Sequence, residues 1–142
     1  MKIFLDTSSL IKLYHTELGT DDLDRLLDEN SVEQIFLAEI AKIEFNSAVW
    51  KKVTTKDLTK DEAVEIIDSF QSDYPNYSFI STDHQLLITA RDLIAKYGFA
   101  GLRTLDSIQL ASILSIKEEL SFAATADELL KSLIEKEGVK SK

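Results

Sequence analysis

The chain has 142 residues, 44% of them hydrophobic, which is enough to bury the core of one domain without disulfides or structural zinc. It contains no cysteine, which excludes thiolate metal sites and thiol nucleophiles and favours a reducing compartment, so we expect a cytoplasmic protein. A net charge of -9 argues against broad electrostatic capture of nucleic acid, since that requires clustered Lys and Arg. Any role on nucleic acid must therefore act locally, with a metal ion supplying positive charge.

Nothing in the sequence indicates a membrane segment or a second domain. The N-terminal apolar run ends after three residues at an aspartate, and no later run approaches the length of a bilayer span. No internal repeat and no Pro/Gly-rich linker divides the chain. We expect a single domain over residues 1–142, with no membrane contact.

Short apolar runs and longer helical patterns alternate along the chain. Residues 2–5 form the first apolar run, and the Asp-Thr-Ser that follows favours the start of a helix. The predicted strands, in chain order, are 2–5, 34–37, 77–80 and 120–125. The predicted helices are a short one ending at residue 14 and then 20–28, 38–53, 59–72, 83–97, 104–117 and 127–137.

Polar residues and glycine mark several of these helix ends. Thr59 and Glu62 have the spacing of a capping box, Gly98 is expected to close the preceding helix, and Thr104 can cap the next one. Short apolar strands separated by helices are typical of crossover units and hence of a parallel sheet buried on both faces. We therefore predict a three-layer α/β/α fold with a central parallel sheet.

Two aspartates follow predicted strands directly. In open parallel sheets the functional crevice lies beyond the carboxyl ends of the strands, and Asp6 and Asp127 both belong there. Each one by itself is better explained as a helix N-cap, because strand-to-helix turns commonly end in Asp, Ser or Thr.

Glu44 is harder to explain as a surface residue. Helical spacing groups it with Ile40, Ala41 and Ala48 on an apolar stripe, whereas Glu39 belongs to a polar stripe. A buried, unpaired carboxylate costs several kcal/mol, so Glu44 must be paired, neutral, or directed at a cleft or a metal. A structural salt bridge and a ligand role both remain open.

Asp106 also has two explanations. It lies in the first turn of its helix, where the dipole favours an acid, and it aligns with Leu102, Leu110 and Ile113 on an apolar stripe. Several acids meeting at strand ends would repel one another unless a cation neutralised them. Oxygen ligands without Cys or His select a hard ion, Mg²⁺ or Mn²⁺, which can orient a phosphodiester and activate water.

Four segments carry a family resemblance over nearly the whole chain: FLDTSSLIKLYH with Asp6, KIEFNSAVW with Glu44, LRTLDSIQLA with Asp106, and ATADELL with Asp127. Each is weak alone, but their order and spacing together resemble the PIN-domain family, specifically its VapC-like toxin branch.

The resemblance implies an Mg²⁺- or Mn²⁺-dependent endoribonuclease of a toxin-antitoxin pair, with the ions held by the four acids and Asp127 acting through water. It also implies supporting hydroxyls at Thr7, Ser8 and Thr125, a homodimer, and inhibition by a small VapB-like antitoxin. Arg103 is a candidate phosphate contact. A candidate RNA-contact edge of mixed basic and aromatic character, more easily explained as a solvated helix face, comprises Trp50, Lys51, Lys52, Lys56 and Lys60.

Other functions fit less well. A haloacid-dehalogenase-like phosphatase would need a second aspartate at the position of Ser8, and a receiver domain would need paired acids after the first strand. A catalytically silent PIN fold that binds protein, or a housekeeping PIN nuclease without an antitoxin, remains an alternative.

Overall fold

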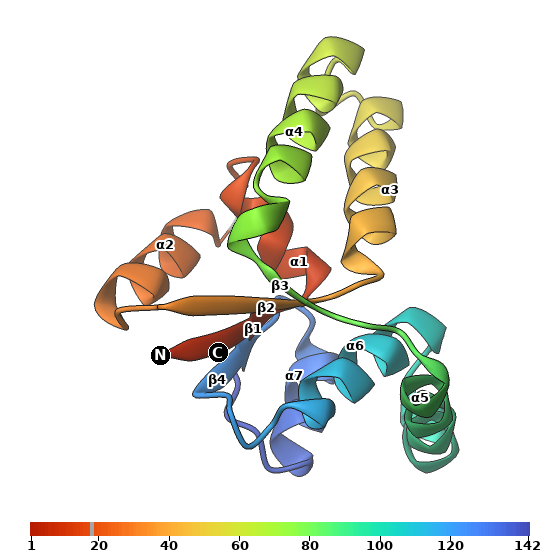
Figure 1. Cartoon of the computed structure of the whole chain (residues 1–142). Helices are drawn as coiled ribbons and strands as arrows, with labels where there is room; N and C mark the ends of the chain where they lie inside the picture. The colour runs from red at the N-terminus through yellow and green to blue at the C-terminus, as the bar shows by residue number, and fades with distance from the viewer. Residues whose placement is uncertain (18) are drawn as a thin grey trace.

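A four-stranded, all-parallel sheet forms the middle layer of the molecule (Figure 1). The computed structural model describes residues 1–17 and 19–142. The strands lie in the order β3-β2-β1-β4 and comprise β1 (Lys2–Leu5), β2 (Gln34–Ala38), β3 (Ser78–Ile80) and β4 (Phe122–Ala124). All four predicted strands are confirmed, and only the ends of the second, third and fourth differ.

Helices cover both faces of this sheet. They are α1 (Thr7–Leu10), α2 (Thr20–Glu29), α3 (Ala41–Thr54), α4 (Lys60–Ser72), α5 (His84–Tyr97), α6 (Thr104–Ser115) and α7 (Glu128–Lys136), with 3-10 turns at Ile11–Leu13, Tyr74–Asn76 and Gly98–Ala100. Figure 1 shows α1 to α4 on one side of the sheet and α5 to α7 on the other. The predicted three-layer α/β/α fold is confirmed.

The alternation of side chains along each strand explains the two cores. Ile3 and Leu5 point into the layer of α1 to α4, whereas Phe4 between them packs with the leucines of α5 to α7. Strand β1 is thus covered on both faces, and all three of these side chains are fully buried. This is why the strands read as unbroken apolar runs instead of alternating ones.

The order of the strands creates a switch point beside β1. The chain builds outward from β1 to β2 and β3 and then returns to place β4 on the opposite side of β1. Right-handed crossovers in opposite directions put the two sets of helices on opposite faces. Loops that leave β1 and β4 therefore diverge, and a crevice is expected at their carboxyl ends.

Three predicted helix ends need correction. The chain stays in β2 through Ala38, and α3 begins only at Ala41. Thr104 does not cap α6, because Arg103 precedes the helix and makes no side-chain capping bond. Helix α5 does end before Gly98, but Gly98 has φ -58 and continues into a 3-10 turn, so the left-handed glycine is Gly101 with φ 112. The capping box of Thr59 and Glu62 is confirmed.

The C-terminal residues cover the outer edge of β4. Ser141 pairs with Ala123 in a parallel bridge, and the amide of Thr125 donates to the carbonyl of Lys142. Unpaired strand edges expose backbone donors and acceptors, so this contact satisfies groups that would otherwise face solvent. Within the described residues, no helix is long and apolar enough to cross a bilayer.

An aromatic cluster holds the long helices α3 and α4 together above the sheet. Phe45 and Phe70 are fully buried with ring centroids 4.3 Å apart, and Tyr14 meets Phe45 edge-on at 5.4 Å. Such contacts add to the area that the rings remove from water.

Phe70→Ala should therefore lower the free energy of unfolding by about 3–5 kcal/mol, since it opens a cavity in this core. The matched control is Phe99→Ala, whose side chain is fully exposed and whose removal should cost less than about 0.5 kcal/mol. Urea denaturation of both variants measures the difference. Equal losses would contradict the placement of Phe70.

Candidate functional site

Asp6 lies at the carboxyl end of β1 and caps α1. Its Oδ1 accepts the backbone N–H of Ser9 at 2.9 Å and the hydroxyl of Ser8 at 2.7 Å, and its Oδ2 accepts the hydroxyl of Thr125. The residue is only 5% exposed. The capping explanation is thus correct, and it leaves a carboxylate whose orientation is set by Ser8 and Ser9 of α1 and by Thr125, which directly follows β4.

Burial dominates the ionisation of this group. Desolvation raises the pKa of the Asp6 carboxyl above its ordinary value, while the hydrogen bonds from Thr125, Ser8 and Ser9 act in the opposite direction. A carboxylate with hydroxyl donors but no cation nearby is one that a bound cation would stabilise strongly.

Glu44 projects from the first turn of α3 toward α1 and α6. Its Oε1 accepts the hydroxyl of Thr7 at 3.2 Å and the amide Nε2 of Gln109 at 2.8 Å. Glu39 instead forms an ion pair with Lys42 at 2.7 Å, in a partly exposed position. Both glutamates are partly buried, so what separates them is their partners: Glu39 has a cation beside it, whereas the contacts of Glu44 are with neutral groups and not with a structural salt bridge.

Asp106 and Asp127 complete the acidic site, a name used below for Asp6, Glu44, Asp106 and Asp127. Asp106 is half-buried in the first turn of α6. Asp127 is exposed and caps α7, with Oδ1 accepting the amide of Leu130 at 2.7 Å. The Thr125 hydroxyl accepts the Asp127 amide at 3.0 Å, which links this turn to Asp6.

The charges of these acids act on one another. Burial raises the pKa of the Asp106 carboxyl, and the negative charges of Asp127 and Asp6 raise it further. Burial also raises the pKa of the Glu44 carboxyl, and hydrogen bonds from Gln109 and Thr7 oppose that shift. The negative charges of Asp106 and Asp6 raise the Glu44 pKa further. In the part of the chain that the structure describes, none of the four is in an ion pair.

The side chains suit a hard divalent ion by their chemistry. All four donors are carboxylates, and hydroxyls stand beside them. Over residues 1–17 and 19–142, no three Asp, Glu or His side chains are close enough together to enclose an ion. Mg²⁺ does not require such a cage, since it commonly retains several waters and takes one or two carboxylates directly.

Comparison with known proteins identifies the family. The sequence profile of the PIN domain matches residues 3–135, which is nearly the whole chain. The protein belongs to the PIN domain family. None of the curated protein sequences compared with this PIN domain matches it significantly.

Solved structures share the fold of this PIN domain at low sequence identity. VapC20 of Mycobacterium tuberculosis, a sarcin-ricin loop cleaving toxin, aligns with TM-score 0.70 and 13% identity over 92% of this chain and 94% of its own. VapBC2 of Rickettsia felis, bound to a promoter DNA fragment, aligns with TM-score 0.65 and 15% identity over 100% and 98%. A toxin-antitoxin complex from Klebsiella pneumoniae aligns with TM-score 0.63 and 16% identity over 88% of this chain and 86% of its own.

One residue of the site escaped the sequence reasoning. Gln109 is 2% exposed and contacts both Thr7 and Glu44, but α6 is buried on nearly all sides, so an apolar-stripe argument does not single it out. The available signal was its polarity between Ile108 and Leu110, three positions after Asp106. Of the other candidates, Arg103 is exposed immediately before α6, and no contact joins it to the acids.

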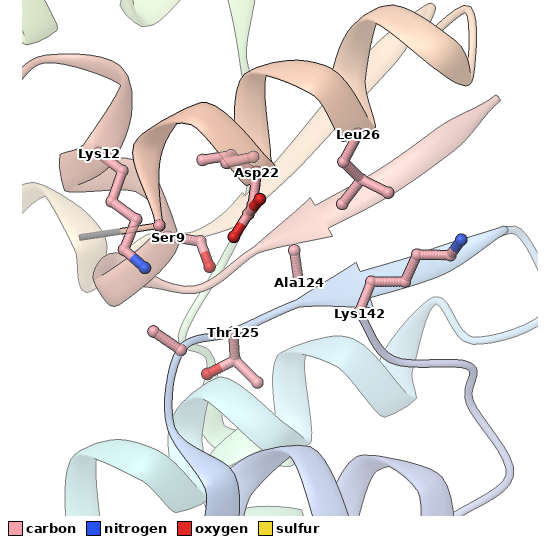
Figure 2. Close-up of a pocket in the computed structure, with 10 residues that line it drawn as sticks. Ser9, Lys12, Asp22, Leu26, Ala124, Thr125 and Lys142 are labelled. Carbon is pink, nitrogen blue, oxygen red and sulfur yellow. The ribbon is translucent and has the colours of Figure 1, made fainter. Parts of the chain in front are cut away.

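A hollow of about 190 Å³ adjoins the acidic site on the side of α2 (Figure 2). Ser9 and Thr125 line it together with Lys12, Asp22 and Lys142. Figure 2 shows the amine of Lys142 turned away from the centre. None of the four acids lines this hollow, so it lies beside the acidic site and is not formed by its carboxylates.

The mutual repulsion of the acids predicts a pH effect on the metal-free protein. Because the folded state raises the pKa of Asp106 above 3.8, the folded chain retains a proton there over a range in which the unfolded chain has lost it. The stability supplied by that proton is present at low pH and is lost as the pH rises through the raised pKa. Asp106→Asn should equal the wild type in stability near about pH 4 and become increasingly more stable than the wild type as the pH rises toward about 7.

Urea denaturation with a chelator present, repeated across this pH range, measures the difference. Asp68→Asn, on the exposed face of α4, is the matched control for replacing an aspartate outside the acidic site. A difference at Asp106 that is constant with pH, or that shrinks as pH rises, would contradict the crowding of charge in the site.

Proposed function

We propose that this PIN domain is a divalent-metal-dependent endoribonuclease and the toxin of a toxin-antitoxin pair. One observation carries the proposal: Asp6, Glu44 and Asp106, from three separate elements, share an electrostatic neighbourhood at the switch point with no cationic partner among the described residues. Structural acids are normally paired with cations, so uncompensated charge of this kind supports a binding role. The cation would be Mg²⁺ or Mn²⁺.

Asp6, Glu44 and Asp106 would hold the ion, one or two of them directly and the remainder through its bound waters. Asp127, exposed and already committed to a cap through one oxygen, would contribute through water. When bound, the ion would orient a phosphodiester, activate water and stabilise charge on the departing oxygen. No protein nucleophile is needed. The chain's own part is to present the carboxylates in fixed directions.

Hydroxyl groups perform that positioning for Asp6. The Ser8 hydroxyl donates to Asp6 and accepts the backbone N–H of Ala126 at 3.0 Å, and Thr125 donates to the other oxygen. The loops after β1 and β4 are thereby tied together through the carboxylate itself. Such outer contacts fix the orientation of metal ligands.

A second hollow, of about 410 Å³, offers a path for the RNA backbone. It begins at Ser8 and Ala126 beside the acidic site and is bordered by Lys12, Lys51 and Lys52. Glu17 and Asp57 also line this hollow, and Glu17 pairs with Lys52 at 2.8 Å. Lys12 and Lys51 are therefore the stronger phosphate contacts. Local lysines next to the acids would supply the positive charge that a chain of net charge -9 lacks overall.

The structural neighbours support the biological role. VapC20 is a toxin that cleaves the sarcin-ricin loop, and the Klebsiella pneumoniae neighbour is a toxin-antitoxin complex. By this likeness the protein would cleave structured RNA, form a homodimer, and be inhibited by a VapB-like antitoxin. Arg103, exposed before α6, is a further candidate for contact with RNA phosphate.

The activity can be tested by comparing two glutamates that differ in environment. Glu44→Gln should reduce Mg²⁺- or Mn²⁺-dependent cleavage of RNA on the order of 100-fold or more, since it removes charge from the site. Glu39→Gln, at a glutamate that lies five residues earlier and is paired with Lys42, should retain activity. A gel assay with purified, antitoxin-free protein measures both, and chelator should abolish the wild-type signal. Equal activity of the two variants, or cleavage that survives chelation, would contradict the proposal.

Asp127→Asn should have a smaller effect than substitutions at the directly binding acids. Asparagine caps a helix as well as aspartate does, so the melting temperature should be retained. Cleavage should fall by about 10-fold, the scale of an outer contact to a metal. The same gel assay combined with thermal denaturation tests this ranking, and a loss as large as that of Glu44→Gln would make Asp127 a direct ligand instead.

A further inference from the structure

We propose that Gln109 is the positioning residue that sets the direction of the Glu44 carboxylate and its separation from Asp106. This inference rests on the proposed metal-dependent function. The Nε2 of Gln109 donates to Glu44 Oε1 at 2.8 Å and to the Thr7 hydroxyl at 3.2 Å. The Thr7 hydroxyl donates to the same Glu44 oxygen at 3.2 Å. The three side chains form a closed triangle.

The triangle joins the two helical layers across the carboxyl edge of the sheet. Glu44 and Thr7 belong to α3 and α1 on one face, whereas Gln109 belongs to α6 on the other. Between these layers the strands themselves provide the main packing surface, and beyond the strand ends that surface is missing. A partly buried side-chain bridge at this edge therefore keeps Glu44 in register with the opposite layer.

The orientation of the Gln109 amide follows from charge. Its NH₂ group can donate to an ionised carboxylate, but its carbonyl oxygen would be repelled, so only one of the two flips fits Glu44. The Oε1 atom then has no hydrogen-bond partner among the described residues, although Gln109 is 2% exposed. A buried acceptor without a partner is costly, so the presence of Gln109 at this buried position of α6 calls for a role.

The positions of Asp106 and Gln109 along α6 indicate what that role is. Asp106 and Gln109 are three positions apart, which places them on the same face of one rigid helix. One helix thus presents Asp106 to the site directly and holds Glu44 through Gln109. The relative positions of these two carboxylates are set by α6 and not by the loops, which is the precision that metal ligands require.

The test compares Mn²⁺ binding by isothermal titration calorimetry in full-length variants. Gln109→Met keeps the length of the side chain and removes the donor, and Gln109→Asn keeps the amide but shortens its reach. Both should weaken Mn²⁺ binding about 10- to 100-fold. Their metal-free melting temperatures should change by only a few degrees, whereas the increase in melting temperature on adding Mn²⁺ should be largely lost.

Ser112→Ala is the matched control, because Ser112 is a fully buried polar residue of the same helix whose hydroxyl bonds only to the Ile108 carbonyl. It should leave Mn²⁺ affinity unchanged. If the wild type binds Mn²⁺ and the Gln109 variants bind it equally well, or lose their fold, the positioning role is overturned while the proposed function stands. If the wild type itself binds no Mn²⁺, the proposed function fails first.

Discussion

The burial of the Asp6 carboxylate at the end of the central strand is the constraint on which the rest of the site depends. Strand β1 has neighbours on both sides, so the residue that follows it enters a place with little access to solvent. Desolvation there penalises the ionised form, and the hydroxyls of Ser8 and Thr125 reduce that penalty without a full counter-charge. The loops after β1 and β4 take their shape from satisfying this one group.

The other acids add to the same electrostatic burden. The negative charge of Asp6 raises the pKa of both Asp106 and Glu44, and the charge of Asp127 also raises that of Asp106. The metal-free protein therefore holds like charges close together at a cost in stability. Natural proteins accept such costs mainly at functional sites, where a ligand compensates for them. Helix capping and metal binding are therefore not competing explanations for Asp6, because the cap positions the oxygens that the site presents.

The fold was largely predictable because its physical signals are local. A strand buried on both faces must be apolar along its whole length, so residues 2–5 and 34–37 indicated their structure without tertiary information. Helix ends were less certain, since several residues compete for one capping position, and Thr104 was assigned a cap that it does not make. The pairing of Ser141 with Ala123 was not foreseen, because a short polar segment pairs only if an open strand edge lies beside it.

The sequence by itself determined the layer architecture, the four acids and their placement after strands or on apolar stripes, since these follow from periodicity and from residue chemistry. Only the tertiary structure decided which groups surround each acid. Glu44 was expected on a buried stripe, but its neighbours Thr7 and Gln109 come from helices 37 and 65 positions away in the chain. Such contacts depend on how the two helical layers pack against each other beyond the edge of the sheet, and no local sequence pattern indicates which residues of the two layers come together there.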